Sequence, residues 1–150
     1  MTAVWQEYLK LMRSLTKTLE GLTQVEREKH NAASRGDLAG VEECMKREQV
    51  ISLTLRGYDQ KRDKLLADLG LKGLTLNQME DHSPDELQLE TKAVAEELRR
   101  QYRLFQAASQ VARDTLEINL RGIEQLQARQ AGDTAEAEES RKQHQTDFRA

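Results

Sequence analysis

Apolar side chains recur every three or four residues along most of this chain, which is the spacing that places them on one face of an α-helix. The repeat is interrupted near Gly36 and again over residues 70–83. The sequence has one proline, Pro84, and is rich in Leu, Glu, Gln, Arg and Ala. Long helices, rather than a sheet, are therefore expected to form the fold.

Local signals divide this pattern into segments. Gly36 suits the left-handed conformation that ends a helix, and Asp37 is a favoured cap for the next one. The Arg35-Gly36-Asp37 tripeptide could be an exposed adhesion loop, but these signals favour a helix corner. The sequence predicts helices over about residues 4–34, 38–69 and 84–130, and a short helical turn over about 76–81.

Capping signals precede the two later helical segments. Thr75 and Gln78 have the spacing of a capping box, so they could start the short turn. For the last helix, Ser83 is the predicted N-cap, with Pro84 at the first helical position and Glu86 at the third. A third long helix is thus predicted to begin at residue 84.

Two long helices joined by a short turn must lie antiparallel. Residues 1–130 are therefore predicted to form a single all-α domain, a long antiparallel helical hairpin plus a third long helix in a coiled-coil-like three-helix bundle. Residues 131–150 are mostly polar, with Phe148 as the only large apolar residue, and are predicted to be a flexible C-terminal tail. A monomer or a weak homodimer is expected.

The third predicted helix is longer than the hairpin along which it runs. Its last part, residues 116–130, is expected to extend past the hairpin and to leave apolar side chains uncovered. Such a contiguous apolar surface is rare in a soluble monomer unless a partner binds it. A helix break near Ser109 or Gly122, or a homodimer, would also cover it. The predicted partner-binding residues are Leu116, Asn119, Leu120, Ile123, Leu126 and Phe148.

Charge and cysteine content exclude several classes of protein. The net charge is −3 and no segment is strongly basic, so nucleic acid is not an expected partner. No apolar run approaches the roughly 18 residues that a membrane span needs, so no membrane insertion is expected. A single cysteine, Cys44, fits a reducing compartment, and the predicted location is the cytoplasm.

The sequence contains no recognisable catalytic motif. His30, His82 and His144 lie more than fifty residues apart, and none follows a glutamate at the spacing of di-iron bundles. Cys44 beside an apolar stripe is interpreted as an inert thiol, and the glycines form no phosphate loop. We therefore expect no enzyme activity, no cofactor and no metal. Glu48 and Asn119 interrupt apolar stripes, and the asparagine could fix helix register or face a partner.

Two stretches resemble the FlgN-type flagellar export chaperones. The first is "ASRGDLAGVEECMKREQVISLTLRGYDQKRDKLLADLGL", residues 33–71, with the Gly36-Asp37 corner, the Leu38–Leu55 helix, Arg62 and Leu69-Gly70-Leu71. The second is "LEINLRGIEQLQ", residues 116–127, which is similar to the late helix of that family. The resemblance covers about residues 5–130 and rests on helical patterns rather than on a catalytic string.

This resemblance implies a cytoplasmic chaperone for bacterial flagellum biogenesis. Such a protein binds hook-associated proteins of the hook–filament junction, prevents their premature aggregation and delivers them to the type III export gate, where it would meet components of that gate. In the family, client binding lies toward the C-terminus, which agrees with the uncovered helix end. A structural coiled-coil or scaffold protein that uses the exposed helical seam for self-assembly is the alternative.

Overall fold

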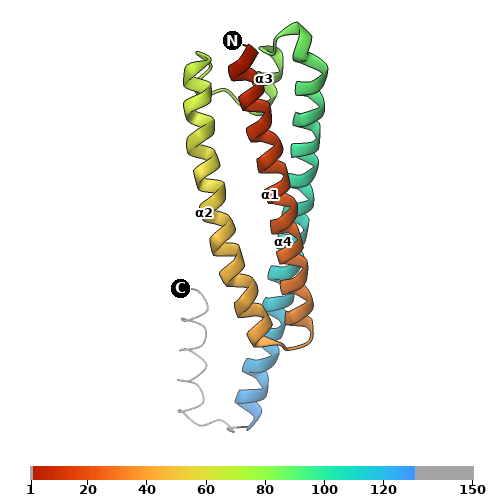
Figure 1. Ribbon diagram of the computed structural model, residues 1–150. Coiled ribbons are helices and arrows are strands. Elements are labelled where there is room, and N and C mark those ends of the chain that lie inside the picture. Colours follow the sequence, from red (N-terminus) through yellow and green to blue (C-terminus); the bar gives the residue numbers. More distant parts are fainter. Residues whose placement is uncertain (1, 131–150) are drawn as a thin grey trace.

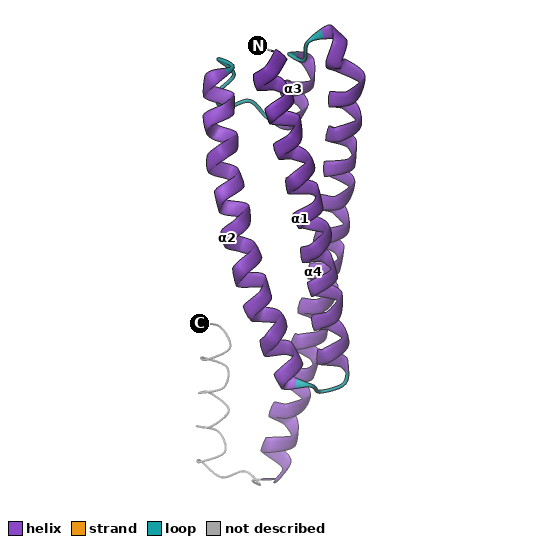
Figure 2. Ribbon diagram, in the orientation of Figure 1, coloured by secondary structure: helices purple, strands orange, loops and turns teal. Residues whose placement is uncertain are grey.

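The computed structural model describes residues 2–130, and within this range the chain forms helices and turns and no strand (Figure 2). The prediction of an all-α helical bundle is confirmed. The elements are α1 (Thr2–Ser34), α2 (Leu38–Asp68), α3 (Leu76–Asp81), the 3₁₀ turn η1 (Asp85–Leu87) and α4 (Gln88–Gln130). Phe148 and the rest of the tail predicted over residues 131–150 lie outside the described residues.

The helix α1 lies between the two other long helices and packs against both (Figure 1). It packs against α2 in an antiparallel hairpin and against α4, which runs in the same direction as α1. No Cα atom of α2 lies within 8 Å of a Cα atom of α4. The arrangement is therefore a bundle in which two helices flank a central one without closing on each other.

The corner between α1 and α2 has the geometry that the sequence predicts. Gly36 has φ +69°, and the Asp37 carboxylate accepts a hydrogen bond of 2.9 Å from Gly40 N. A Cβ atom on Gly40 would lie 2.5 Å from Asp37 Oδ2, so a larger residue there would displace the capping carboxylate. The Arg35-Gly36-Asp37 tripeptide is a helix corner.

At the opposite end of the bundle, one predicted cap is present and the other is not. Thr75 and Gln78 form the reciprocal capping box that starts α3. The prediction that Ser83 caps a helix starting at Pro84 is wrong. Pro84 has ψ 142°, which is extended, so the chain makes a 3₁₀ turn before α4 begins at Gln88. The Ser83 hydroxyl instead forms a 2.8 Å hydrogen bond with Thr91 Oγ1.

The main core lies at the end of the bundle where α1 begins. Trp5 and Tyr8 are fully buried there, with ring centroids 5.4 Å apart, and the Trp5 indole donates a 2.9 Å hydrogen bond to Thr91 Oγ1. Met79 of α3 covers the same cluster. Apart from these, the buried members are Leu9, Leu11, Met12, Leu19, Leu66, Leu69, Leu87 and Leu98.

Candidate binding groove

A groove of about 900 Å³ lies between α2 and α4, whose backbones do not approach each other closely. Side chains from α1, α2, α4 and the segment that enters α3 line it. The lining residues are Met12, Leu15, Leu19, Leu55, Asp59, Arg62, Leu74, Thr75, Leu76, Leu98, Arg99 and Tyr102. Most of this surface is apolar, which suits the burial of apolar side chains of a ligand.

Core residues form the floor of the groove, and residues of α2 and α4 outside the core form its rims. Leu19 and Leu98 are buried members of the core cluster. Leu55 of α2 and Tyr102 of α4 line the groove without packing against that cluster, and Tyr102 is 52 % exposed. These two rim side chains are consequently free to contact a molecule that occupies the groove.

Apolar character continues along α2 toward the corner. At about 100° per residue, Leu38 and Met45 lie about 100° and about 80° around the helix from Leu55, which lines the groove. Both apolar side chains are exposed. The helix α2 therefore has an exposed apolar edge beside the side that lines the groove.

Two arginines line opposite walls of the groove. Arg99 of α4 forms an ion pair with Glu80 and a hydrogen bond with Asn77. Arg62 of α2 donates a 3.3 Å hydrogen bond from Nη2 to the Leu74 carbonyl. No carboxylate of residues 2–130 lies within 4.0 Å of its guanidinium.

The buried phenol of Tyr8 lies in the electrostatic field of this end of the groove. Burial raises the pKa of Tyr8, the charge of Arg62 lowers it and the charge of Glu80 raises it further. The Tyr8 hydroxyl and Arg62 Nε are both buried and have no hydrogen-bond partner among the described residues. Of these two groups, only Arg62 belongs to a residue that lines the groove.

The projecting end of α4 is shorter than the sequence suggests. Leu116 packs against the small cluster of Ala32, Ala33 and Val41 at the corner, and Asn119 Nδ2 donates to the Ala33 carbonyl. Leu116, which was expected to be uncovered, thus contacts the hairpin, and so does Asn119, which was expected either to fix helix register or to face a partner. The Ala33 carbonyl also accepts a 3.1 Å hydrogen bond from Gly36 N, so the Asn119 amide is its second donor.

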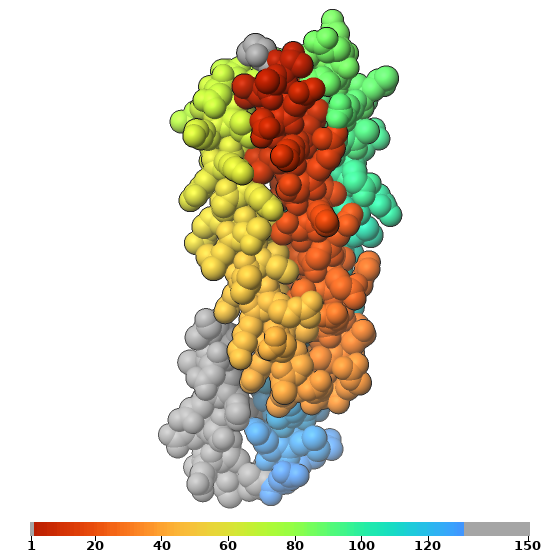
Figure 3. Space-filling model, viewed as in Figure 1, coloured from red at the N-terminus to blue at the C-terminus, as the bar shows by residue number. Residues whose placement is uncertain are grey.

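Beyond Asn119, α4 extends past the corner by eleven residues, or about 16 Å. Figure 3 shows this end, in blue, below the orange corner. Ile123 is 42 % exposed and Leu126 is 56 % exposed, whereas Leu120 is half-buried. Partner contact by these three residues stays a prediction. Ile118 is also exposed, but it lies on nearly the opposite side of α4 from Leu116.

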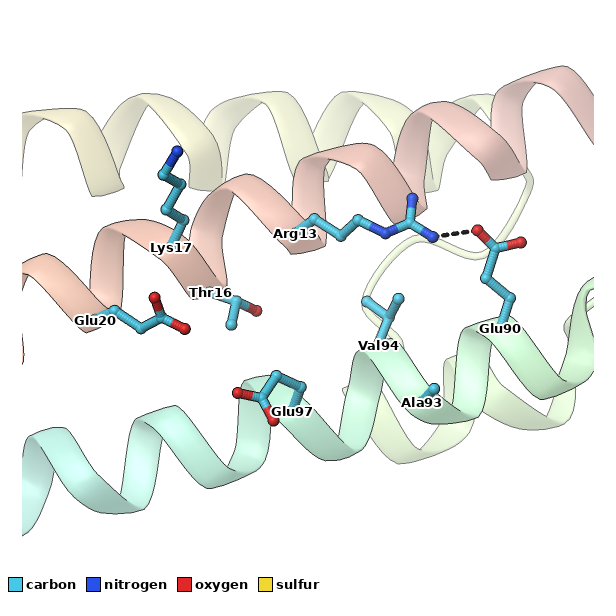
Figure 4. Close-up of a pocket in the computed structure, with 8 residues that line it drawn as sticks. All are labelled: Arg13, Thr16, Lys17, Glu20, Glu90, Ala93, Val94 and Glu97. Carbon is cyan, nitrogen blue, oxygen red and sulfur yellow. Dashed lines mark hydrogen bonds and ion pairs between the residues drawn. The ribbon is translucent and has the colours of Figure 1, made fainter.

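A second, shallower crevice of about 520 Å³ lies between α1 and α4 (Figure 4). Arg13 reaches across it to form an ion pair with Glu90, and Lys17 points away from α4. The hydroxyl of Thr16 donates to the Met12 carbonyl. The charged groups that line this crevice are solvated or paired, and the Thr16 hydroxyl is already hydrogen-bonded, so the crevice offers no activated nucleophile.

Three charged side chains meet between α1 and α2. Lys29 Nζ lies 2.7 Å from Glu48 Oε1 and 3.2 Å from Glu26 Oε2. Burial raises the pKa of Glu26, Lys29 lowers it and Glu48 raises it. The pKa of Lys29 is also raised, because the two carboxylates outweigh the effect of its burial. The single ammonium of Lys29 thus lies between two carboxylates and is nearer to that of Glu48.

Glu26→Gln is expected to flatten the pH dependence of stability. Because the folded-state pKa of Glu26 lies above its ordinary value of 4.5, the native state binds more protons than the unfolded state in the window above that value. The free energy of unfolding should therefore fall as pH rises through this window. Glutamine cannot ionise, so the variant should lose this fall. Urea denaturation between about pH 4 and 8 measures it.

Glu42→Gln, at an exposed position on α2, is the matched control and should keep the slope of the unmodified chain. Equal slopes for the unmodified chain and Glu26→Gln would contradict the account of the Glu26–Lys29–Glu48 cluster.

The described residues contain no obvious reaction centre. Cys44 is buried, and burial raises the pKa of its thiol, which disfavours the reactive thiolate. His30 is bonded through Nδ1 to Thr115 Oγ1 at 2.8 Å. Within residues 2–130, no group of three or more His, Cys, Asp or Glu side chains is placed to hold a metal ion. None of the helices in this range combines the length and apolar character needed to cross a membrane.

No protein-family model matches the sequence, and neither a curated protein nor a solved structure matches it. The contacts and exposed surfaces of the chain itself therefore supply the basis for a functional proposal. The groove is the feature that sequence reasoning missed, since helical periodicity does not reveal that α4 packs on α1 and not on α2.

Proposed function

We propose that this chain is a cytoplasmic export chaperone that binds an amphipathic helix of a hook-associated flagellar protein, prevents premature aggregation of that client and delivers it to the type III export gate. One observation carries the helix-binding part of the proposal. The flanking helices α2 and α4 leave an apolar groove over α1, where a helix of another protein would find apolar surface on three sides. The resemblance of residues 33–71 and 116–127 to FlgN-type chaperones supports the choice of client.

Helix docking suits both the size and the chemistry of this groove. Helices dock into such grooves through apolar residues spaced three and four apart, which fill the groove while polar residues stay in water. Leu55 and Tyr102 would contact the docked helix on its two sides. Ile123 and Leu126 on the projecting end of α4 would add a second contact region.

Ile123→Glu combined with Leu126→Glu is expected to weaken client binding about tenfold, because the loss of two apolar contacts at an interface edge removes part of its energy. Stability should change little, since both side chains are exposed. Isothermal titration calorimetry with the purified client measures the change. Ile118→Glu is the matched control, because Ile118 is 66 % exposed on the same helix and lies about 140° around it from Ile123. Equal losses of client affinity in the two variants would show that the projecting end is not part of the binding site.

The identity of the client is tested by affinity purification of the full chain from its native cells, followed by mass spectrometry. Hook-associated proteins should be recovered, and they should be lost when Leu55 and Tyr102 are both replaced by glutamate. Recovery of the chain alone would contradict the proposal.

Self-assembly is the second candidate function. The uncovered Ile123 and Leu126 could pair with the same residues of a second copy, as in a scaffold protein. Sedimentation equilibrium separates the two functions, because a scaffold forms a tight dimer or larger assembly that a client peptide does not dissociate.

A further inference from the structure

We infer that Arg62 is the residue through which the groove selects its ligand, by binding an Asp or Glu side chain on the docked amphipathic helix. This inference rests on the proposed helix-binding function and adds to it a chemical requirement on the partner. It concerns one end of the groove, where Arg62 lies beside Leu74.

Arg62 differs from every other arginine of residues 2–130. Ten of these twelve arginines are exposed, and only Arg62 and Arg99 are half-buried. Arg99 is neutralised by Glu80. Arg62 has no carboxylate within 4.0 Å, and its single hydrogen bond goes to a neutral carbonyl at 3.3 Å.

An unpaired guanidinium in this position is costly to the free protein. Removing a cation partly from water is unfavourable unless an anion or several acceptors replace the lost hydration. Arg62 Nε is buried without an acceptor among residues 2–130, so the burial of this guanidinium is only partly compensated. A carboxylate is the group that matches the planar fork of a guanidinium, with two parallel hydrogen bonds.

The charges of the groove favour an anionic group on the ligand. Because Arg99 is paired with Glu80, Arg62 is the one arginine of the lining without a carboxylate within 4.0 Å, and the lining carboxylate Asp59 is exposed and lies farther than that from the Arg62 nitrogens. Most other residues of the lining, among them Leu15 and Leu55, are apolar. The complementary ligand is a helix whose apolar face carries one acidic residue at the edge that meets Arg62.

The test uses synthetic peptides of 25 residues that tile the terminal segments of the hook-associated proteins from the organism that encodes this chain. Fluorescence anisotropy selects the tightest peptide for the unmodified full chain. Arg62→Gln should then weaken its binding about tenfold, since a charge-assisted hydrogen bond is lost. Arg103→Gln, which makes the same change at an exposed position of α4, should leave the affinity unchanged.

The acidic group on the peptide is identified by changing each Asp or Glu to its amide in turn. One such change should weaken binding to the unmodified chain about tenfold. The same peptide change should leave the affinity for the Arg62→Gln variant unaltered, as expected when the two groups contact each other. If only amidation of the peptide C-terminus has this effect, the bound carboxylate is the chain terminus and the assignment to a side chain is overturned.

Two other outcomes separate this inference from the proposed function. If no peptide binds the unmodified chain, both fail. If a peptide binds and Arg62→Gln has the same affinity as Arg103→Gln, helix binding stands and the role of Arg62 is overturned.

Arg62→Met, measured without peptide, tests whether Arg62 instead has a structural role. We expect an equal or higher melting temperature, because the variant removes a poorly compensated charge. A clear fall in melting temperature would show that Arg62 mainly holds the Leu74 segment in place, and would overturn the inference.

Discussion

Replacing both Leu55 and Tyr102 by glutamate is expected to weaken client binding about 100-fold or more, because two carboxylates would then face the apolar side of the docked helix. The fold should persist, since neither side chain packs against the main core cluster. Isothermal titration calorimetry with a purified hook-associated protein measures the affinity. Circular dichroism checks that helical content is unchanged.

Leu53→Glu is the matched control for this result. Leu53 lies on the same helix as Leu55, is 65 % exposed and does not line the groove. Its replacement should leave client affinity within a factor of about two of the unmodified chain, as is usual for a surface substitution. Equal loss of binding in the control and in the groove variant would show that charge on α2, rather than the groove, controls binding.

Trp5→Ala is expected to have the largest effect on stability. The indole is buried at the centre of the main core, so its removal leaves a cavity and should lower the free energy of unfolding by about 3–5 kcal/mol. This is a large share of the roughly 5–15 kcal/mol typical of a domain. Urea denaturation followed by circular dichroism measures it, because the variant lacks the only tryptophan of the chain.

Thr91→Val separates the hydrogen bond of Trp5 from its packing. Valine keeps the shape of threonine but leaves Trp5 Nε1 buried without an acceptor, which should cost about 1–3 kcal/mol. Thr54→Val is the control, because Thr54 is exposed and bonds only to the Val50 carbonyl of its own helix. If Thr91→Val is as stable as this control, the Trp5–Thr91 bond contributes nothing to the fold.

Most of the helical architecture was predictable from local signals. Apolar periodicity located the long helices. Gly36 and Asp37 located the corner, because a glycine in the left-handed conformation ends one helix and an aspartate caps the next. The capping box of Thr75 and Gln78 was likewise visible as a spacing of three residues. In each case the determining interactions join residues close in the chain.

The errors came from contacts between residues distant in the chain. Ser83 was predicted to cap a helix, but its hydroxyl bonds to Thr91, which also accepts from Trp5. Leu116 was predicted to be uncovered, but it packs against the corner, and Asn119, which could have fixed helix register or faced a partner, donates to a carbonyl at the end of α1. Periodicity shows that a helix has an apolar face and does not show which helix that face meets. The groove between α2 and α4 depends on this pairing and could not be derived from the sequence.

Site-specific photo-crosslinking in living cells is the most direct test of helix binding in the groove. A photoreactive phenylalanine analogue placed at position 55 of the full chain would lie on the groove wall, and at position 53 it would face away from the groove. We expect position 55 to crosslink to a helical terminal segment of a hook-associated protein, and position 53 to give little or no such product. Crosslinks from position 55 only to a second copy of this chain, or equal products from both positions, would contradict the account.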